Sequence, residues 1–306
     1  MIRGNILIVG LSTVDLRISK PFASPGADKR LEAEKYRFSA GGIGANTAIA
    51  ISRLGWGSML CTAIGDDMFG NTFSNIFYDE RVEPRYIKVC RNAQTPIKLS
   101  LEDQKGGEVY IPSASRFIGM TDVETSFNVM PDAVITTLEL PFDVVSTADR
   151  CTGAQGTKLI LDSTGAEEST DISALKNIEI MVLSDKDLAT LTGVTVKSID
   201  DRMNGCIKLN AKVKIRYTII DMEEKGYYIY DGKYCDFIMP FDDIPVVNSK
   251  CGREAFLAAL TISYLRTDNI KSSVEFASAA SAIARGREGS FESLPTEKEI
   301  RDYLKK

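Results

Sequence analysis

Short apolar runs alternate along this chain with longer helix-like segments, and this alternation restricts the possible folds more than any other feature. A short continuous apolar run bounded by turn residues is typical of a buried strand. Runs of this kind lie at 6–9, 58–63, 133–136, 158–161, 178–183 and 217–220. Segments expected to form helices lie at 45–54, 69–79, 254–265 and 273–285. Strands that alternate with helices in this way predict an α/β fold, a three-layer α/β/α sandwich.

Three segments do not fit this alternation of strands and helices. Between residues 96 and 112 apolar and polar residues alternate on both sides of a Gly-Gly pair, which predicts a β-hairpin with one solvated face. Residues 227–237 predict a second antiparallel hairpin that turns at Asp231 and Gly232. Residues 17–38 are mixed and polar, with two prolines, and we expect a loop with short strands outside the main sheet.

Composition narrows the class of protein. The chain has 306 residues, enough for one large α/β domain over 1–306, and a formal net charge of −5. No cluster of lysine and arginine would follow a phosphate backbone, so we expect no nucleic-acid partner. No apolar stretch is long enough to cross a bilayer, and the first residues lack a signal-peptide pattern. The six cysteines are scattered, without a C-x-x-C pair. We therefore expect a cytoplasmic protein with reduced thiols and no membrane partner.

The chain contains no histidine. This excludes Ser-His-Asp triads, Cys-His pairs and histidine-based zinc sites. Acid–base chemistry in this protein must therefore use Asp, Glu, Lys, Tyr or Cys.

A glycine-rich segment stands directly before the first predicted helix. Residues 41–46 read Gly-Gly-Ile-Gly-Ala-Asn. Glycines let the backbone approach a ligand closely, and the start of a helix offers free N–H groups. The amide of Asn46 can donate to and accept from a sugar hydroxyl. The structural alternative is a glycine-rich turn in which Asn46 caps the helix.

At this segment the chain resembles the first signature of the ribokinase-like, or PfkB-type, carbohydrate kinases. The stretches 10–15, 64–70, 138–141 and 294–297 are similar to further family segments in the expected order, so the resemblance covers nearly the whole chain. It implies a mostly parallel central sheet and a small β-sheet lid, formed by about 12–38 and 95–113, that often also joins a homodimer. It also implies that a sugar or nucleoside is held by Asp15, Gly41, Gly42, Asn46 and Glu139.

The second family signature is altered. The family has Asp-Thr-x-Gly-Ala-Gly-Asp before a late helix, where glycine amides hold the transferred phosphoryl group and the last Asp is the base. Here residues 248–254 read Asn-Ser-Lys-Cys-Gly-Arg-Glu. The resemblance makes Glu254 the base, one methylene longer than Asp, and places the amides around Gly252 at the phosphoryl group. Arg253 either obstructs that group or donates to it as a cation. The alternative for Glu254 is a first-turn acid favoured by the helix dipole.

Cys251 stands in a glycine position of the same signature. If its backbone is left-handed, a non-glycine residue there costs on the order of 1–2 kcal/mol. Its thiol either has a lowered pKa beside two cations at a helix start or is simply a small residue that fills the site.

The segments expected to hold ATP and Mg²⁺ also depart from the family pattern. Where relatives have Asn-x-x-Glu, residues 184–187 read Ser-Asp-Lys-Asp, so Asp187 is the candidate for a hydrated metal ion. Where relatives have Thr-x-Gly, residues 221–223 read Asp-Met-Glu, and Gly226 follows. The nucleotide-binding candidates are therefore Ser184, Asp187, Asp221, Glu223, Gly226 and Cys251.

Two functions stay open at this stage. The first is an ATP-dependent sugar or nucleoside kinase in which Glu254 is the base. The second is a binding or regulatory protein on the same scaffold, with its sugar pocket kept and its phosphoryl transfer impaired.

Overall fold

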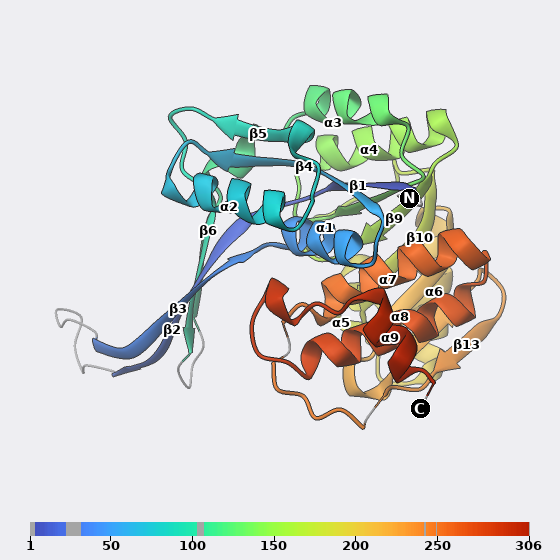
Figure 1. Ribbon diagram of the computed structural model, residues 1–306. Coiled ribbons are helices and arrows are strands. Elements are labelled where there is room, and N and C mark those ends of the chain that lie inside the picture. The colour runs from blue at the N-terminus through green and yellow to red at the C-terminus, as the bar shows by residue number, and fades with distance from the viewer. Residues whose placement is uncertain (1–3, 23–31, 103–106, 242, 249, 306) are drawn as a thin grey trace.

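The computed structural model describes residues 4–22, 32–102, 107–241, 243–248 and 250–305, and these contain two sheets (Figure 1). The main sheet has nine strands in the order β13-β12-β11-β10-β9-β8-β1-β4-β5. Its strands are β1 (Asn5–Val9), β4 (Gly57–Gly65), β5 (Ile87–Cys90), β8 (Ala133–Thr137), β9 (Lys158–Asp162), β10 (Ile178–Ser184), β11 (Ile215–Asp221), β12 (Tyr227–Tyr230) and β13 (Cys235–Ile238). All neighbouring strands pair in parallel except β11 with β12 and β12 with β13, which are antiparallel. The predicted central strands and the late hairpin are confirmed.

Helices cover both faces of this sheet. They are α1 (Ile43–Arg53), α2 (Met68–Asp79), α3 (Met120–Ser126), α4 (Phe142–Gln155), α5 (Asp185–Thr192), α6 (Ile199–Lys212), α7 (Gly252–Thr267), α8 (Ile270–Arg285) and α9 (Glu297–Tyr303). Alternate residues of a buried strand point to opposite faces. In β1, Ile6 and Ile8 belong to the core shared with α1, α2, α7 and α8, whereas Leu7 and Val9 belong to the core shared with α3 to α6. The predicted three-layer sandwich is therefore confirmed.

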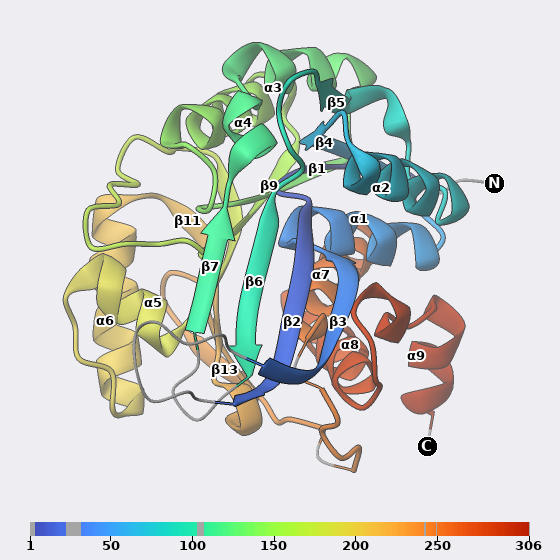
Figure 2. The ribbon, with the colours of Figure 1, turned by 90° about the vertical axis from the view of Figure 1, so that its left-hand side faces the viewer.

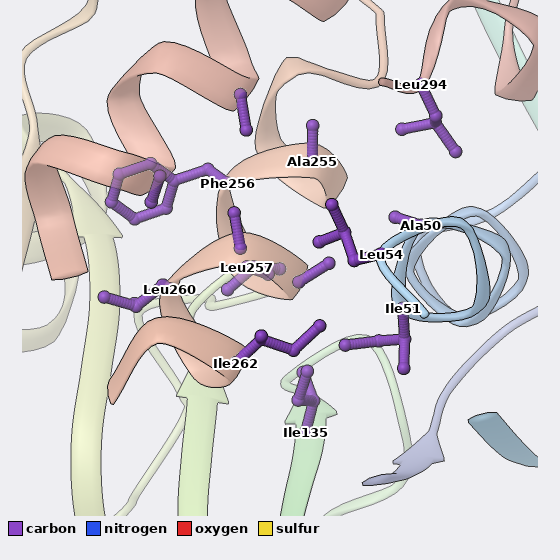
Figure 3. Packing of buried hydrophobic residues seen from close by; sticks show 14 of the residues in the cluster. Ala50, Ile51, Leu54, Ile135, Ala255, Phe256, Leu257, Leu260, Ile262 and Leu294 are labelled. Carbon is purple, nitrogen blue, oxygen red and sulfur yellow. The ribbon is translucent and has the colours of Figure 1, made fainter. Parts of the chain in front are cut away.

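The packing of α1 against α7 brings two helix starts together. Figure 3 shows Ala50, Ile51 and Leu54 of α1 next to α7, with Leu257 and Ile262 on its facing side. Small side chains along both helices let their backbones approach closely. As a result, the glycine-rich segment before α1 and the altered signature before α7 lie at one place.

A second sheet, called the lid sheet below, lies beside the main body (Figure 2). Its strands are β2 (Thr13–Phe22), β3 (Glu32–Gly41), β6 (Ile97–Glu102) and β7 (Gly107–Ile111), in the order β3-β2-β6-β7. The β2–β3 and β6–β7 pairs are antiparallel, and β2 pairs with β6 in parallel. The hairpin predicted over 96–112 is present, although its turn at 103–106 lies outside the described residues.

The expectation of a loop with short strands over 17–38 was wrong for β2 and β3, which have ten residues each. Apolar and polar residues alternate over 14–19 in β2 and over 35–40 in β3. That period of two outweighs the prolines, because Pro21 lies near the end of β2. No helix in the described ranges is long and apolar enough to cross a membrane.

Candidate active site

A cavity of about 360 Å³ lies where the lid sheet meets the starts of α1 and α7. Its lining comes from segments far apart in the sequence and includes most of the predicted acceptor and catalytic residues. The lining residues are Leu11, Thr13, Asp15, Gly42, Ile43, Asn46, Lys98, Tyr110, Glu139, Thr164, Lys250, Cys251, Arg253 and Glu254. We call this the acceptor cavity.

The glycine-rich segment forms one wall because side chains would not fit there. Gly42 caps α1 with φ of +91°, and a Cβ at Gly42 would lie 2.6 Å from the carbonyl oxygen of Leu11. A Cβ at Gly41 would lie 2.6 Å from the carboxyl carbon of Asp15. Glycine at both positions therefore allows β2 and α1 to approach each other and leaves room for the Asp15 carboxylate.

Asn46 is buried in this wall with one polar atom unmatched. Its Nδ2 donates to Oε1 of Glu254 at 3.4 Å, while Oδ1 has no hydrogen-bond partner among the described residues. A buried amide oxygen without a partner is costly, so such atoms usually have a use. The hydroxyl of a ligand in the cavity would supply the missing donor.

Asp15 is held between two donors. Thr13 donates to Oδ1 at 3.1 Å, and the ammonium of Lys250 donates to Oδ2 at 2.9 Å. Burial raises the pKa of the Asp15 carboxyl above its usual value, while the Thr13 hydrogen bond lowers it. Each carboxylate oxygen has further lone pairs, so Asp15 can still accept from a ligand hydroxyl.

Glu254 lies in the first turn of α7 and faces Asn46. Burial raises the pKa of its carboxyl above the ordinary value for glutamate. A carboxylate with a raised pKa is a stronger proton acceptor than an exposed one. Glu254 is a first-turn acid, as the structural alternative predicts, and it also lines the acceptor cavity, while its role as the base stays a prediction.

The Arg253 side chain reaches from the start of α7 to the carboxyl ends of three interior strands of the main sheet. Its Nε donates to Oδ2 of Asp162 at 2.6 Å, and its Nη2 donates to the carbonyl of Val182 at 3.1 Å. Its Nη1 lies 3.8 Å from Oδ2 of Asp221. Arg253 therefore balances carboxylates at the ends of β9 and β11, and it still lines the acceptor cavity.

Cys251 caps α7 with a left-handed backbone, φ of +58°, as a glycine position would predict. Burial raises the pKa of its thiol, so the alternative of a lowered pKa is wrong. The carboxylates of Glu254, Asp15 and Glu292 raise this pKa further, and the thiol fills space next to Ser290. The side chain of Cys251 does not cap the start of α7, so the N–H of Gly252 remains available to a ligand.

The other nucleotide-side candidates lie outside the acceptor cavity, at the ends of neighbouring strands. Ser184 and Asp187 form a capping box at the start of α5, and Ser163 also donates to Oδ2 of Asp187 at 2.7 Å. Asp221 ends β11 and accepts from the backbone N–H of Glu223. Gly226, with φ of +90°, lies directly before β12. Within the part of the chain that the structure describes, no group of three or more His, Cys, Asp or Glu residues could hold a metal ion.

Sequence reasoning missed several residues of the acceptor cavity, chiefly Lys98, Tyr110 and Lys250. Lys98 pairs with Asp15 across β6 and β2, so knowledge of the strand register would have revealed it. Lys250 stands directly before Cys251, and a lysine inside that signature is the signal that could have identified it.

Comparisons with known proteins give one consistent result. The model of the pfkB family of carbohydrate kinases matches residues 3–297. The ribokinase of Haemophilus influenzae is 24% identical over 311 residues, which cover 99% of each chain. The deoxyribokinase of Salmonella typhi is 22% identical, over 98% of each chain. The structure of Arabidopsis thaliana ribokinase complexed with ribose and ATP covers 100% of each chain, with a TM-score of 0.91 and 19% identity, so the two chains share a fold.

Proposed function

The chain belongs to the pfkB family of carbohydrate kinases, and we propose that it transfers the terminal phosphoryl group of ATP to a hydroxyl of a sugar or nucleoside. The observation that carries the proposal is the acceptor cavity, where Glu254, Asn46 and the uncapped start of α7 meet under Asp15. A hydroxyl bound there has a carboxylate to take its proton and N–H groups to receive negative charge.

Different residues of the acceptor cavity bind the acceptor, take its proton and stabilise the transferred phosphoryl group. Asp15, Asn46 and Glu139 bind acceptor hydroxyls, and Gly41 and Gly42 shape the wall that brings them close. Glu254 accepts the proton of the attacking hydroxyl. The N–H groups around Gly252 stabilise the charge on the transferred phosphoryl group, as donors preset at a helix start do. The guanidinium of Arg253 adds positive charge nearby.

The nucleotide would lie over the ends of β10 and β11, near Ser184, Asp187, Asp221, Glu223 and Gly226. Mg²⁺, when bound with the nucleotide, would spread the charge of the donor phosphates. Asp187 could help to hold the hydrated Mg²⁺, because the hydrogen bonds it accepts from the described residues all go to Oδ2. Its Oδ1 would face a water of the hydrated ion, and Mg²⁺ usually keeps several such waters.

The experiment measures ADP formation with Mg·ATP across a panel of pentoses, hexoses and nucleosides. For the acceptor that reacts, Glu254→Gln should lower kcat by about 10²- to 10⁴-fold, the usual contribution of a general base. Glu275→Gln, an exposed glutamate on α8, is the control and should leave kcat unchanged. Equal kcat for Glu254→Gln and the wild type would exclude Glu254 as the base.

The contact of Arg253 with Asp162 favours a second candidate, a sugar-binding protein with impaired transfer. In that case the guanidinium would stay with its carboxylates and leave the donor phosphates without a cation. The same panel separates the two, because a binding protein would be stabilised by an acceptor in thermal unfolding yet form no ADP.

We also propose that two copies pair through the lid sheet. One face of this sheet is mostly apolar, and its apolar side chains include Leu16, Ile18, Tyr36, Phe38, Leu99, Val109 and Ile111. Tyr36 is 74% exposed and Val109 is 52% exposed. A broad exposed apolar face on a sheet is typical of an interface, and a second copy offers the same face. The predicted cytoplasmic location stays a prediction.

A further inference from the structure

The opposite face of the lid sheet is strongly cationic. Its described side chains include Arg17 on β2, Lys35 and Arg37 on β3, and Lys98 on β6. Among the side chains that the structure describes on this face, Asp15 alone is acidic. This face looks toward the acceptor cavity, since Asp15 and Lys98 both line it.

Two of these cations lie directly opposite each other. Arg17 on β2 pairs in register with Arg37 on β3. Like charges in such a cross-strand pair repel and destabilise the sheet. Arg37 forms an ion pair with Glu288 at 3.1 Å, and Arg17 also has an interaction within the chain. The Glu288 side chain is 69% exposed, so solvent weakens the attraction by which Glu288 offsets the repulsion between the two arginines.

The arginine pair faces a cavity of about 410 Å³ that adjoins the acceptor cavity. It is lined by Arg17, Arg37, Phe38, Ser39, Asn248, Lys250, Glu288, Gly289, Ser290 and Glu292. Lys250 lines both cavities and connects them. Neither Glu254 nor Asn46 reaches this second cavity. A group placed there would therefore lie beyond Asp15, away from the reacting hydroxyl.

We propose that this second cavity binds an oxyanion carried by the acceptor, so that the preferred acceptor is an anionic sugar with a phosphate or carboxylate group. The inference rests on the proposed function, because it names the substrate class of the same site. Arginine guanidinium groups match the geometry of phosphate and carboxylate oxygens, and Lys250 adds a point charge from the signature before α7. The bound anion would also relieve the repulsion between Arg17 and Arg37.

The carboxylates near the cavity do not cancel this preference. The backbone N–H of Ser290 donates to Oε2 of Glu292 at 2.9 Å, which directs that carboxylate to its own loop. Asp15 does not line the second cavity. Glu288 lies at the exposed rim, where its partner Arg37 can turn toward a ligand at small cost.

The test measures Kd by calorimetry for ribose, ribonate, ribose 5-phosphate and inorganic phosphate at constant ionic strength. For the wild type we expect at least one anionic sugar to bind tenfold or more tightly than ribose. In Arg17→Gln and Arg37→Gln the ratio of the two Kd values should fall toward one. Arg85→Gln is the matched control, since Arg85 is similarly exposed and also lies near a glutamate, and it should keep the wild-type ratio.

Three outcomes overturn the proposal. They are equal Kd values for neutral and anionic sugars, an advantage of the anionic sugar that both arginine variants keep, and binding of inorganic phosphate at this site without any advantage for an anionic sugar. If either variant fails to fold, the affinity of the wild type for the anionic sugar must fall as salt rises while that for ribose stays constant. ADP formation is measured separately, so its absence would reject the kinase proposal without rejecting the anion subsite.

Discussion

Arg253 shows at the level of one residue how this site tolerates an unusual substitution. A long cation stands in a glycine position of the signature, and its partner Asp162 is fully buried at the end of β9. A buried carboxylate without a counter-charge is strongly destabilising. The guanidinium and the carboxylate therefore depend on each other, and neither can be exchanged alone without loss.

The first prediction tests this dependence. Arg253→Met should lower the free energy of unfolding by about 3–5 kcal/mol, because it leaves the buried Asp162 charge unpaired. Asp162→Asn in the same background should recover much of that loss. The measurement is urea unfolding of the wild type, both single variants and the double variant. Strictly additive effects would show that the two side chains are not coupled.

The second prediction concerns the pH dependence of activity. The carboxyl of Glu254 has a pKa above its ordinary value because it is buried, and the base must be ionised to act. The acidic limb of log kcat/KM should therefore fall at a higher pH than the ordinary glutamate value of about 4.3. An acidic limb at the ordinary value would show that Glu254 titrates like an exposed glutamate.

The third prediction is the effect of the same carboxyl on stability. The folded state binds the Glu254 proton more tightly than the unfolded state does, so ionisation disfavours folding as pH rises from the unfolded pKa toward the folded one. Glu254→Gln cannot ionise, and its melting temperature relative to the wild type should rise over that interval. Glu275→Gln serves as the reference, and a difference that is constant from pH 4 to 8 would contradict the shift.

Among the elements, the start of α1 depends on glycine for close packing. The fourth prediction compares Gly42→Ala with Gly156→Ala, since both glycines have positive φ, at +91° and +67°. A Cβ at Gly156 meets nothing within 4 Å, so that change should cost only the left-handed strain, about 1–2 kcal/mol. Gly42→Ala adds a clash with Leu11 and should cost clearly more and weaken acceptor binding. Urea unfolding and acceptor titration measure both, and equal losses would reject the role of close packing.

Most elements could be predicted from the sequence because their patterns are local. The buried strands β1, β8, β9, β10 and β11 read as short apolar runs, and α7 and α8 as alanine-rich segments. A lid sheet with short strands was expected here, but the ten-residue length of β2 and β3 was not predicted, because prolines and charges hid a period of two. Polar residues of these strands line the acceptor cavity and the second cavity beside it, so the chemistry of the site itself obscured the strand signal.

At the scale of the whole molecule, the cavity could be predicted only where one segment carries a recognisable motif. Asp15, Asn46 and Glu254 were found in this way and lie together. Lys98 and Lys250 were not, because their place depends on the register of β6 with β2 and on a contact between residues 235 positions apart. The contact of Arg253 with Asp162 likewise could not be predicted from the sequence, because it depends on β9 lying next to β10 in the sheet.

The fifth prediction belongs to the assembly. The apolar face of the lid sheet should join two copies, and Tyr36→Lys together with Val109→Lys should convert the dimer to a monomer. A stable interface removes roughly 800 Å² from each partner, and two charges placed on a desolvated apolar face oppose that burial strongly. Sedimentation velocity at several protein concentrations measures the change.

The matched control for this change is Tyr78→Lys, which replaces a tyrosine that is 84% exposed on α2, away from the lid sheet. It should leave the sedimentation coefficient unchanged. Since the cationic face of the same sheet lines the acceptor site, separation of the copies should also raise KM for the acceptor, because the lid sheet loses the support of its partner. A wild type that is monomeric at every concentration, or a double variant that stays dimeric, would show that this apolar face does not join two copies.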